Sequence, residues 1–324
     1  MNKPSRFNRF ILVSIVSALL AITMLLSGCT SSQPSPVTPE TTAAIQPTTT
    51  MPLQTAGSTP AITTAMPLTT TAASATTTLA PKYTPSEKTL IVYTAASLKG
   101  VSTKLGTQFS AAYPGHSAVF NLDGTQALKT QVENGAYADV FISASNTYTN
   151  TLKGEGYFIN STVKPLTTNY LIVILPSDNP GKILTLADLA KSGVKIAMED
   201  KSVPAGTATY AVLANLAKST YNQDWNTSVF KNVVTYETSE PGVATKVSLG
   251  EVDAGFVYES TFTAAPKDTY LAITIPKADN YLQTYTIGVL KQTRSTGAAQ
   301  EFEDFMLSGA GQQMLKDYGF RPVS

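Results

Sequence analysis

Small and hydroxyl-bearing residues follow three β-rich runs of this chain, each time where a helix is expected to begin. They are Ala-Ala-Ser-Leu at 95–98, Asp-Gly-Thr at 123–125 and Val-Pro-Ala-Gly at 203–206. A helix start presents unpaired backbone N–H groups and the positive end of the helix dipole, so several starts that meet form an anion site without Lys or Arg. Ser97 and Thr125 would add hydroxyl donors. Each segment by itself also suits an ordinary helix cap or turn, but their shared architecture favours an anion site.

Groups that could catalyse a reaction are scarce, because the chain has one His and one Cys. His116 stands in a Pro-Gly-His turn before an expected strand, which suits a surface position. The sequence contains no Gly-x-Ser-x-Gly, Walker loop, His-Glu-x-x-His or clustered acidic metal site. Nucleophilic triads and zinc sites need more His or Cys than are available. We therefore expect a protein that is not an enzyme and has no resident cofactor.

Strand-like and helix-like runs alternate from residue 88 onward, which predicts an α/β fold with mostly parallel sheets flanked by helices. The expected strands are 90–93, 118–122, 139–143, 170–175, 194–198, 233–236, 252–258, 271–275 and 285–290. The expected helices are 97–113, 128–132, 186–190, 205–218, 243–249, 298–307 and 311–318. Ligands of such sheets bind beyond the carboxyl ends of the strands, where the three segments fall.

Five segments occur in one order along residues 88–324. They are Tyr-Thr-Ala-Ala-Ser-Leu at 93–98, Asp-Val-Phe-Ile-Ser-Ala at 139–144, Val-Pro-Ala-Gly at 203–206, Gly-Glu-Val-Asp-Ala-Gly-Phe-Val-Tyr at 250–258 and Tyr-Gly-Phe-Arg-Pro at 318–322. Together they resemble the molybdate-binding proteins of ABC importers, the ModA family. The resemblance implies a type II periplasmic-binding fold, with two α/β lobes that close on an anion. Lobe one is then expected at 88–169 and 285–324, lobe two at 170–284, and the crossing strands at 170–175 and 285–290.

The same resemblance implies the residues that hold the oxyanion, which would be molybdate or tungstate. The hydroxyls of Ser97, Thr125 and Tyr258 are expected to donate, with Thr125 standing where the family has Ser. The backbone N–H groups of Ala205 and Val243 are expected to complete the set. Molybdenum or tungsten would enter only as the bound oxyanion, and no other metal is implied.

Two acidic residues depart from the family pattern. Glu240 falls where the family has a Val at a helix start, and the shorter spacing of Glu-Pro-Gly-Val at 240–243 moves the expected N–H to Val243. A Glu240 side chain that points inward would repel a dianion or bind it as an extra ligand. Asp123 is a second carboxylate beside the expected site. Both residues bear on which ligand is bound more than on which fold the chain adopts.

The first 28 residues have the features of a secretory signal. Three cations precede an almost uninterrupted apolar run at 10–26, which ends in Leu-Ser-Gly-Cys. This ending resembles the lipobox of prokaryotic lipoproteins, in which the signal is cut before the Cys. We therefore expect a signal peptide at 1–28 and a lipid on Cys29, the only cysteine. A membrane-spanning helix over the apolar run is the alternative.

A segment of biased composition, residues 29–87, links the expected anchor to the folded part. Between residues 30 and 80 there are seventeen Thr, seven Pro and one charged residue. Such a segment cannot bury enough apolar surface to fold and is expected to be a solvated tether. A mucin-like adhesive stalk is the alternative. The net charge is +1 with the three signal-peptide cations included, so the remainder is near −2 and does not suit nucleic-acid binding.

These features predict a monomeric, lipid-anchored solute-binding protein on the extracytoplasmic side of the membrane, in a periplasm or at the cell surface. It would deliver molybdate or tungstate to the permease and ATPase subunits of an ABC importer. Three alternatives stay open: a binding protein for sulfate, thiosulfate or a small organic acid, an extracellular hydrolase on a two-lobed scaffold, and a stalked adhesin.

Overall fold

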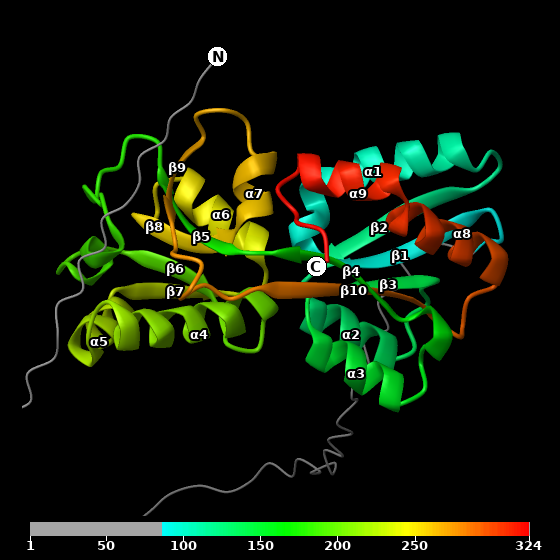
Figure 1. The fold of residues 1–324 in the computed structure, drawn as a ribbon, viewed down its shortest axis with the longest axis horizontal. Helices are drawn as coiled ribbons and strands as arrows, with labels where there is room; N and C mark the ends of the chain where they lie inside the picture. Colours follow the sequence, from blue (N-terminus) through cyan, green and yellow to red (C-terminus); the bar gives the residue numbers. More distant parts are fainter. Residues whose placement is uncertain (1–85, 324) are drawn as a thin grey trace, which may run out of the picture. The chain divides into compact units, whose positions relative to one another are not determined.

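The structure, a computed structural model, describes residues 86–323 (Figure 1). The expected signal peptide, Cys29 and nearly all of the expected tether lie outside the described residues. Within 86–323, no helix is both long enough and apolar enough to cross a membrane.

Two five-stranded sheets form the centres of two lobes (Figure 1). The order in lobe one is β2 (Ser117–Asp123), β1 (Thr89–Ala95), β3 (Val140–Ser143), β10 (Gln283–Val289) and β4 (Lys164–Asn169). The order in lobe two is β7 (Val233–Glu237), β6 (Ile196–Glu199), β8 (Ala254–Tyr258), β5 (Leu171–Pro176) and β9 (Tyr270–Thr274).

Both sheets are mixed, whereas we expected them to be mostly parallel. In lobe one, β1 runs parallel to β2 and β3, but β10 is antiparallel to β3 and β4. In lobe two, β6 runs parallel to β7 and β8, but β5 is antiparallel to β8 and β9. The reason is the connection between the lobes: β5 and β10 enter their sheets from the other lobe, and so run against the strands beside them.

Helices cover both faces of each sheet (Figure 1). In lobe one, α1 (Lys99–Ala112), α8 (Thr296–Leu307) and α9 (Gly309–Asp317) lie on one face, and α2 (Thr125–Glu133) and α3 (Asn146–Gly154) on the other. In lobe two, α4 (Pro204–Ser219) and α5 (Gln223–Lys231) lie opposite α6 (Glu240–Ser248) and α7 (Glu259–Ala264). Short 3-10 helices are η1 (Ala96–Leu98), η2 (Asn160–Thr162) and η3 (Leu186–Ala190).

The core explains why the central strands are apolar throughout instead of alternating. On β1, Leu90 and Val92 pack in the cluster with α1, α8 and α9, while Ile91 and Tyr93 pack in the cluster with α2. Side chains of a strand alternate between the two faces of the sheet, and here each face is covered by helices. Every position of such a strand is therefore buried, as the burial of β1 from Leu90 onward shows.

The lobes are joined where the chain passes from β4 to β5 and from β9 to β10. Tyr170 is the one residue between β4 and β5, while residues 275–282 connect β9 to β10. The Asn280 side chain ties the two connections together. Its Oδ1 accepts from the Leu171 N–H at 3.2 Å, and its Nδ2 donates to the Leu171 carbonyl at 2.8 Å.

Candidate functional site

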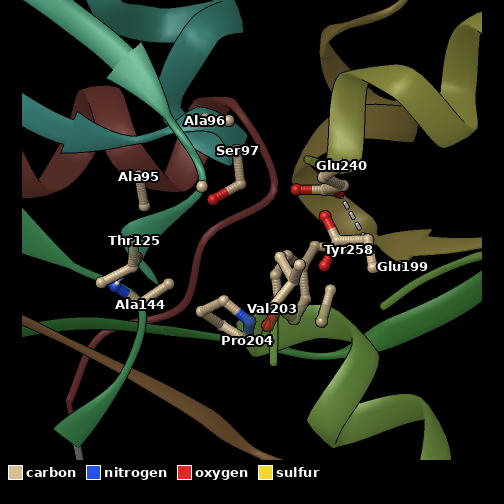
Figure 2. A pocket seen from close by; sticks show the side chains of 12 residues that line it. Ala95, Ala96, Ser97, Thr125, Ala144, Glu199, Val203, Pro204, Glu240 and Tyr258 are labelled. Atoms are coloured by element: carbon tan, nitrogen blue, oxygen red, sulfur yellow. Dashed lines mark hydrogen bonds between the residues drawn. The ribbon is translucent and has the colours of Figure 1, made fainter. Parts of the chain in front are cut away.

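A small pocket lies between the two lobes and contains about 220 Å³ of space free of atoms, part of it open to solvent (Figure 2). Residues at the starts of helices line it from both sides. Lobe one contributes the starts of η1, which continues into α1, and of α2, and lobe two contributes the starts of α4 and α6. The three segments that the sequence singled out, at 95–98, 123–125 and 203–206, therefore do meet in space.

The wall from lobe one carries two hydroxyl groups. Ser97 is 8% exposed and makes no cap for η1 or α1, so ordinary capping does not account for it. Its Oγ lies 2.8 Å from the Tyr285 hydroxyl, and either group can be the donor. Thr125 is the first residue of α2, and its Oγ1 accepts from the Ala144 N–H at 3.1 Å. The Thr125 hydroxyl proton is therefore free to be donated elsewhere.

Two buried phenols lie at the site, Tyr258 at the end of β8 in lobe two and Tyr285 on β10, the strand that enters lobe one from lobe two. Tyr258 ends β8, lines the pocket and donates from its hydroxyl to Gln283 Oε1 at 3.2 Å. Tyr285 on β10 packs edge-on against Tyr258, with 6.1 Å between the ring centroids. Burial is the main reason that the pKa values of Tyr258 and Tyr285 lie well above the ordinary range. Both phenols therefore keep their protons at neutral pH and can act as donors.

Glu199, which sequence reasoning missed, also lines the pocket. It is the last residue of β6, is 2% exposed, and accepts at Oε2 from the Gly206 N–H at 3.1 Å. Burial, followed by repulsion from Glu240, raises its pKa well above the usual range, while hydrogen bonds from the N–H groups of Gly206 and Ala205 act in the opposite direction. Its place after an apolar strand, at the carboxyl end, was the available signal.

Glu240 is the first residue of α6 and points into the pocket (Figure 2). It is 3% exposed, and its Oε1 accepts from the Tyr258 N–H at 2.7 Å and from Thr261 Oγ1 at 2.6 Å. Its other oxygen, Oε2, is buried and has no hydrogen-bond partner among the described residues. Burial raises the pKa of Glu240 to about 7, although both hydrogen bonds lower it.

The other predicted site residues differ in position. Ala205 lines the pocket at the start of α4. The Val243 side chain is fully buried in the core beneath α6 and does not line the pocket, so the role of its N–H stays a prediction. Asp123 does not line the pocket either. Its Oδ1 accepts from the Gly124 N–H at 2.7 Å within the turn.

Besides the bond from Tyr258 to Gln283, hydrogen bonds from two side chains of lobe one reach backbone carbonyls of lobe two beside the site. Gln126 Nε2 donates to the Thr238 carbonyl at 2.8 Å, and the Tyr148 hydroxyl donates to the Ser202 carbonyl at 2.5 Å. Of the described residues that line the pocket, none is Lys, Arg or His. Nor does any group of three or more His, Cys, Asp or Glu within 86–323 have an arrangement that could hold a metal ion. The site can bind a ligand by hydrogen bonds from hydroxyl and N–H groups.

Comparison with known proteins gives consistent matches over the folded part. The family model described as bacterial extracellular solute-binding protein matches residues 90–321. The molybdate-binding protein ModA of Mycobacterium tuberculosis is 32% identical over 238 residues, which cover 73% of this chain and 86% of that protein.

Solved structures share the fold. The periplasmic molybdate-binding protein of Azotobacter vinelandii aligns with a TM-score of 0.63 at 21% identity, over 72% of this chain and all of that one. The sulfate-binding protein SubI of Mycobacterium tuberculosis aligns with a TM-score of 0.65 at 17% identity, over 73% of this chain and 88% of that one. Because proteins named for different anions share this architecture, the fold does not select the ligand, and the residues of the pocket must do so.

Proposed function

Because this chain belongs to the ModA family of bacterial extracellular solute-binding proteins, we propose that it captures molybdate or tungstate in the pocket between its lobes. It is a binding protein and not an enzyme, and the oxyanion is its ligand, not a cofactor. One observation carries the proposal. The starts of η1, α2, α4 and α6 converge on one pocket, and none of the described residues that line this pocket is a cation. Helix starts attract an anion without a fixed countercharge.

The proposed donors come from both lobes. Ser97, Thr125 and Tyr258 would supply hydroxyls, and the N–H groups of Ala205 and Val243 would supply backbone donors. On binding, Tyr258 would exchange Gln283 for the ligand, and the Ala205 N–H would exchange Glu199 for it. Support for the three hydroxyls is direct contact with the pocket and burial, since each is at most 8% exposed. Buried donors with fixed geometry select an anion by the distances between its oxygens, so donors spaced for molybdate or tungstate would reject the smaller sulfate.

The same proposal includes the location and the partners. The family is extracytoplasmic, and a lipid on Cys29 would hold the protein at the membrane through the segment at 30–87. The loaded monomer would deliver its oxyanion to the permease and ATPase of an ABC importer. A Cys29→Ala chain is expected to leave the membrane fraction, which cell fractionation measures.

The proposal is tested by thermal unfolding of the full chain, stripped of ligand, in the presence of molybdate, tungstate, sulfate, phosphate or thiosulfate. A ligand that binds only the folded form stabilises it by about 2.7 kcal/mol at a hundred times its dissociation constant. We expect molybdate and tungstate to raise the unfolding temperature and sulfate not to do so.

Ser97→Ala combined with Tyr258→Phe should abolish this rise. Ser102→Ala is the matched control, because Ser102 is buried in α1, outside the pocket, and donates to the Lys99 carbonyl in the same helix. A rise with sulfate or thiosulfate and none with molybdate would favour the alternative of another anion. No rise with any of the five would refute oxyanion capture.

A further inference from the structure

Two carboxyl groups share the pocket in which we propose that a dianion binds. Glu199 and Glu240 both line it, and repulsion from Glu240 contributes to the raised pKa of Glu199. If both were ionised when the dianion bound, four negative charges would be enclosed together, with no cation among the described residues of the lining. Burying charge without a partner is very unfavourable, and ionisable groups respond by taking up protons.

The free oxygen of Glu240 is the place where such a proton can act. Oε1 already accepts two hydrogen bonds, from Tyr258 N–H and Thr261 Oγ1, whereas Oε2 has none among the described residues. In Figure 2 the Glu240 side chain reaches from the start of α6 toward Ser97 on the facing wall. A proton on Oε2 changes a buried acceptor that lacks a donor into a donor that faces the ligand space.

The groups around Glu240 are neutral or acidic. Glu199 faces it from β6, Tyr258 from β8 and Tyr285 from β10, and the pKa of each is raised in part by a negative charge at Glu240. Thr261 on α7 is its neutral hydrogen-bond donor, and Ser97 of η1 lies across the pocket. Lys99 is exposed and lines the adjoining groove with Thr261, not this pocket. The described surroundings therefore offer no buried cation that could replace a proton.

We infer that this pocket binds its oxyanion together with one proton, which Glu240 carries on its free oxygen and donates to the ligand. The inference rests on the proposed function. The proton comes from solvent as the ligand enters and returns to solvent when it leaves. With a pKa of about 7 in the ligand-free protein, Glu240 must be protonated by binding at alkaline pH, and binding weakens there.

The test is titration calorimetry of the full chain, in detergent, with sodium molybdate between about pH 6 and about pH 9. If binding needs one added proton, the affinity should be nearly constant below about pH 7 and fall about tenfold per pH unit above about pH 8. At about pH 8, buffers with different ionisation enthalpies should report uptake of about one proton per molybdate.

Glu240→Gln separates the proton from the hydrogen bond. The amide oxygen can keep accepting from Tyr258 N–H and Thr261, and the amide NH₂ then permanently donates where Oε2 was. We expect this variant to bind molybdate about as well at pH 9 as at pH 6. Glu303→Gln is the matched control, since Glu303 is a buried carboxyl of α8 paired with Lys164, with a raised pKa, outside the pocket. This control should keep the wild-type pH profile.

The outcomes are distinct. Binding with a flat pH profile and no proton uptake in the wild type overturns this inference and leaves the proposed function standing. A slope that persists in Glu240→Gln overturns the assignment to Glu240. Absence of molybdate binding at every pH refutes the proposed function itself, and the inference with it. If Glu240→Gln does not fold, the wild-type proton count decides.

Discussion

The two walls of the pocket are built alike and differ in charge. Each lobe contributes two helix starts, but lobe one brings the hydroxyls of Ser97 and Thr125, while lobe two brings the carboxyls of Glu199 and Glu240. On the lobe-two side the helix starts already have acidic neighbours: Glu199 accepts from Gly206 N–H in α4, and Glu240 is itself the first residue of α6. Converging helix starts thus do not guarantee equivalent anion donors. Lobe one offers hydroxyl donors, and lobe two offers donors whose availability depends on protonation.

Gly206→Ala is expected to have the largest effect, because it disrupts the wall of lobe two at the start of α4. A Cβ there would lie 1.9 Å from the Asp200 carbonyl oxygen, so the start of α4 has to move. We expect the free energy of unfolding, measured with urea, to fall by about 3 kcal/mol, at the upper end for overpacking.

Gly297→Ala is the control, because this helical glycine in α8 has open space at its Cβ. It should leave the protein equally stable or more stable by about 0.5–1 kcal/mol. Equal losses in the two variants would show that the contact at Gly206 does not constrain α4.

The charge of Glu240 in the wall of lobe two should also affect the stability of the ligand-free chain. The folded pKa of Glu240 is about 7, above its ordinary value of 4.5, so the folded state favours the protonated form. Stability from this group is therefore complete below about pH 4.5, declines as pH rises to about 7, and is constant above. The expected decline is about 3 kcal/mol.

Urea unfolding of wild type and Glu240→Gln at about pH 5 and about pH 8 measures this effect. Relative to the wild type, the free energy of unfolding of Glu240→Gln should rise by roughly this amount between about pH 5 and about pH 8. If their difference in unfolding free energy is the same at both, Glu240 does not titrate in this range.

Ser97→Ala tests the wall of lobe one. A hydrogen bond to a charged group contributes about 1.5–3 kcal/mol, so molybdate affinity measured by calorimetry should fall about 10- to 100-fold. Tyr285→Phe removes the same contact between Ser97 and Tyr285 but leaves the Ser97 hydroxyl in the pocket. The loss of molybdate affinity in Tyr285→Phe should be much smaller than in Ser97→Ala. Equal losses of affinity in the two variants would mean that Ser97 acts only by holding Tyr285.

The smallest expected effect concerns contact between the walls. Gln126→Ala removes the bond from Gln126 Nε2 to the Thr238 carbonyl, which we expect to weaken molybdate binding about fivefold, for about 1 kcal/mol. Gln131→Ala on the same helix removes a bond to Asn121 within lobe one and should leave affinity unchanged. Equal affinities of the two variants would count against a role of the inter-lobe contact in closure.

Apolar periodicity predicted the central strands well, because burial on both faces makes their sequences apolar throughout. The elements that it missed are polar. Helix α3 reads Asn-Thr-Tyr-Thr-Asn-Thr-Leu-Lys-Gly and begins with a cap from Ser145, whose side chain accepts from the Tyr148 N–H. Strand β4 contains Pro165 and ends in Thr-Thr-Asn, yet its last residues are buried. Thr167 there donates to the Arg321 carbonyl, a distant partner that no local pattern indicates.

The site divides in the same way. Motif position indicated Ser97, Thr125 and Ala205, because each stands near a helix start, and the family resemblance added Tyr258; all four line one pocket. The carboxyls were harder to predict. The direction of the Glu240 side chain depends on how α6 packs against β8, and the burial of Glu199 depends on its contact with the start of α4.

The Asn280 side chain, which joins the two connections between the lobes, restricts how these connections can move. Asn280 engages both backbone groups of Leu171, so sliding of one connecting segment along the other would break both hydrogen bonds. Such a tie limits how far the two walls can be displaced before a ligand is present. Little conformational entropy is lost on binding when the geometry is arranged in advance.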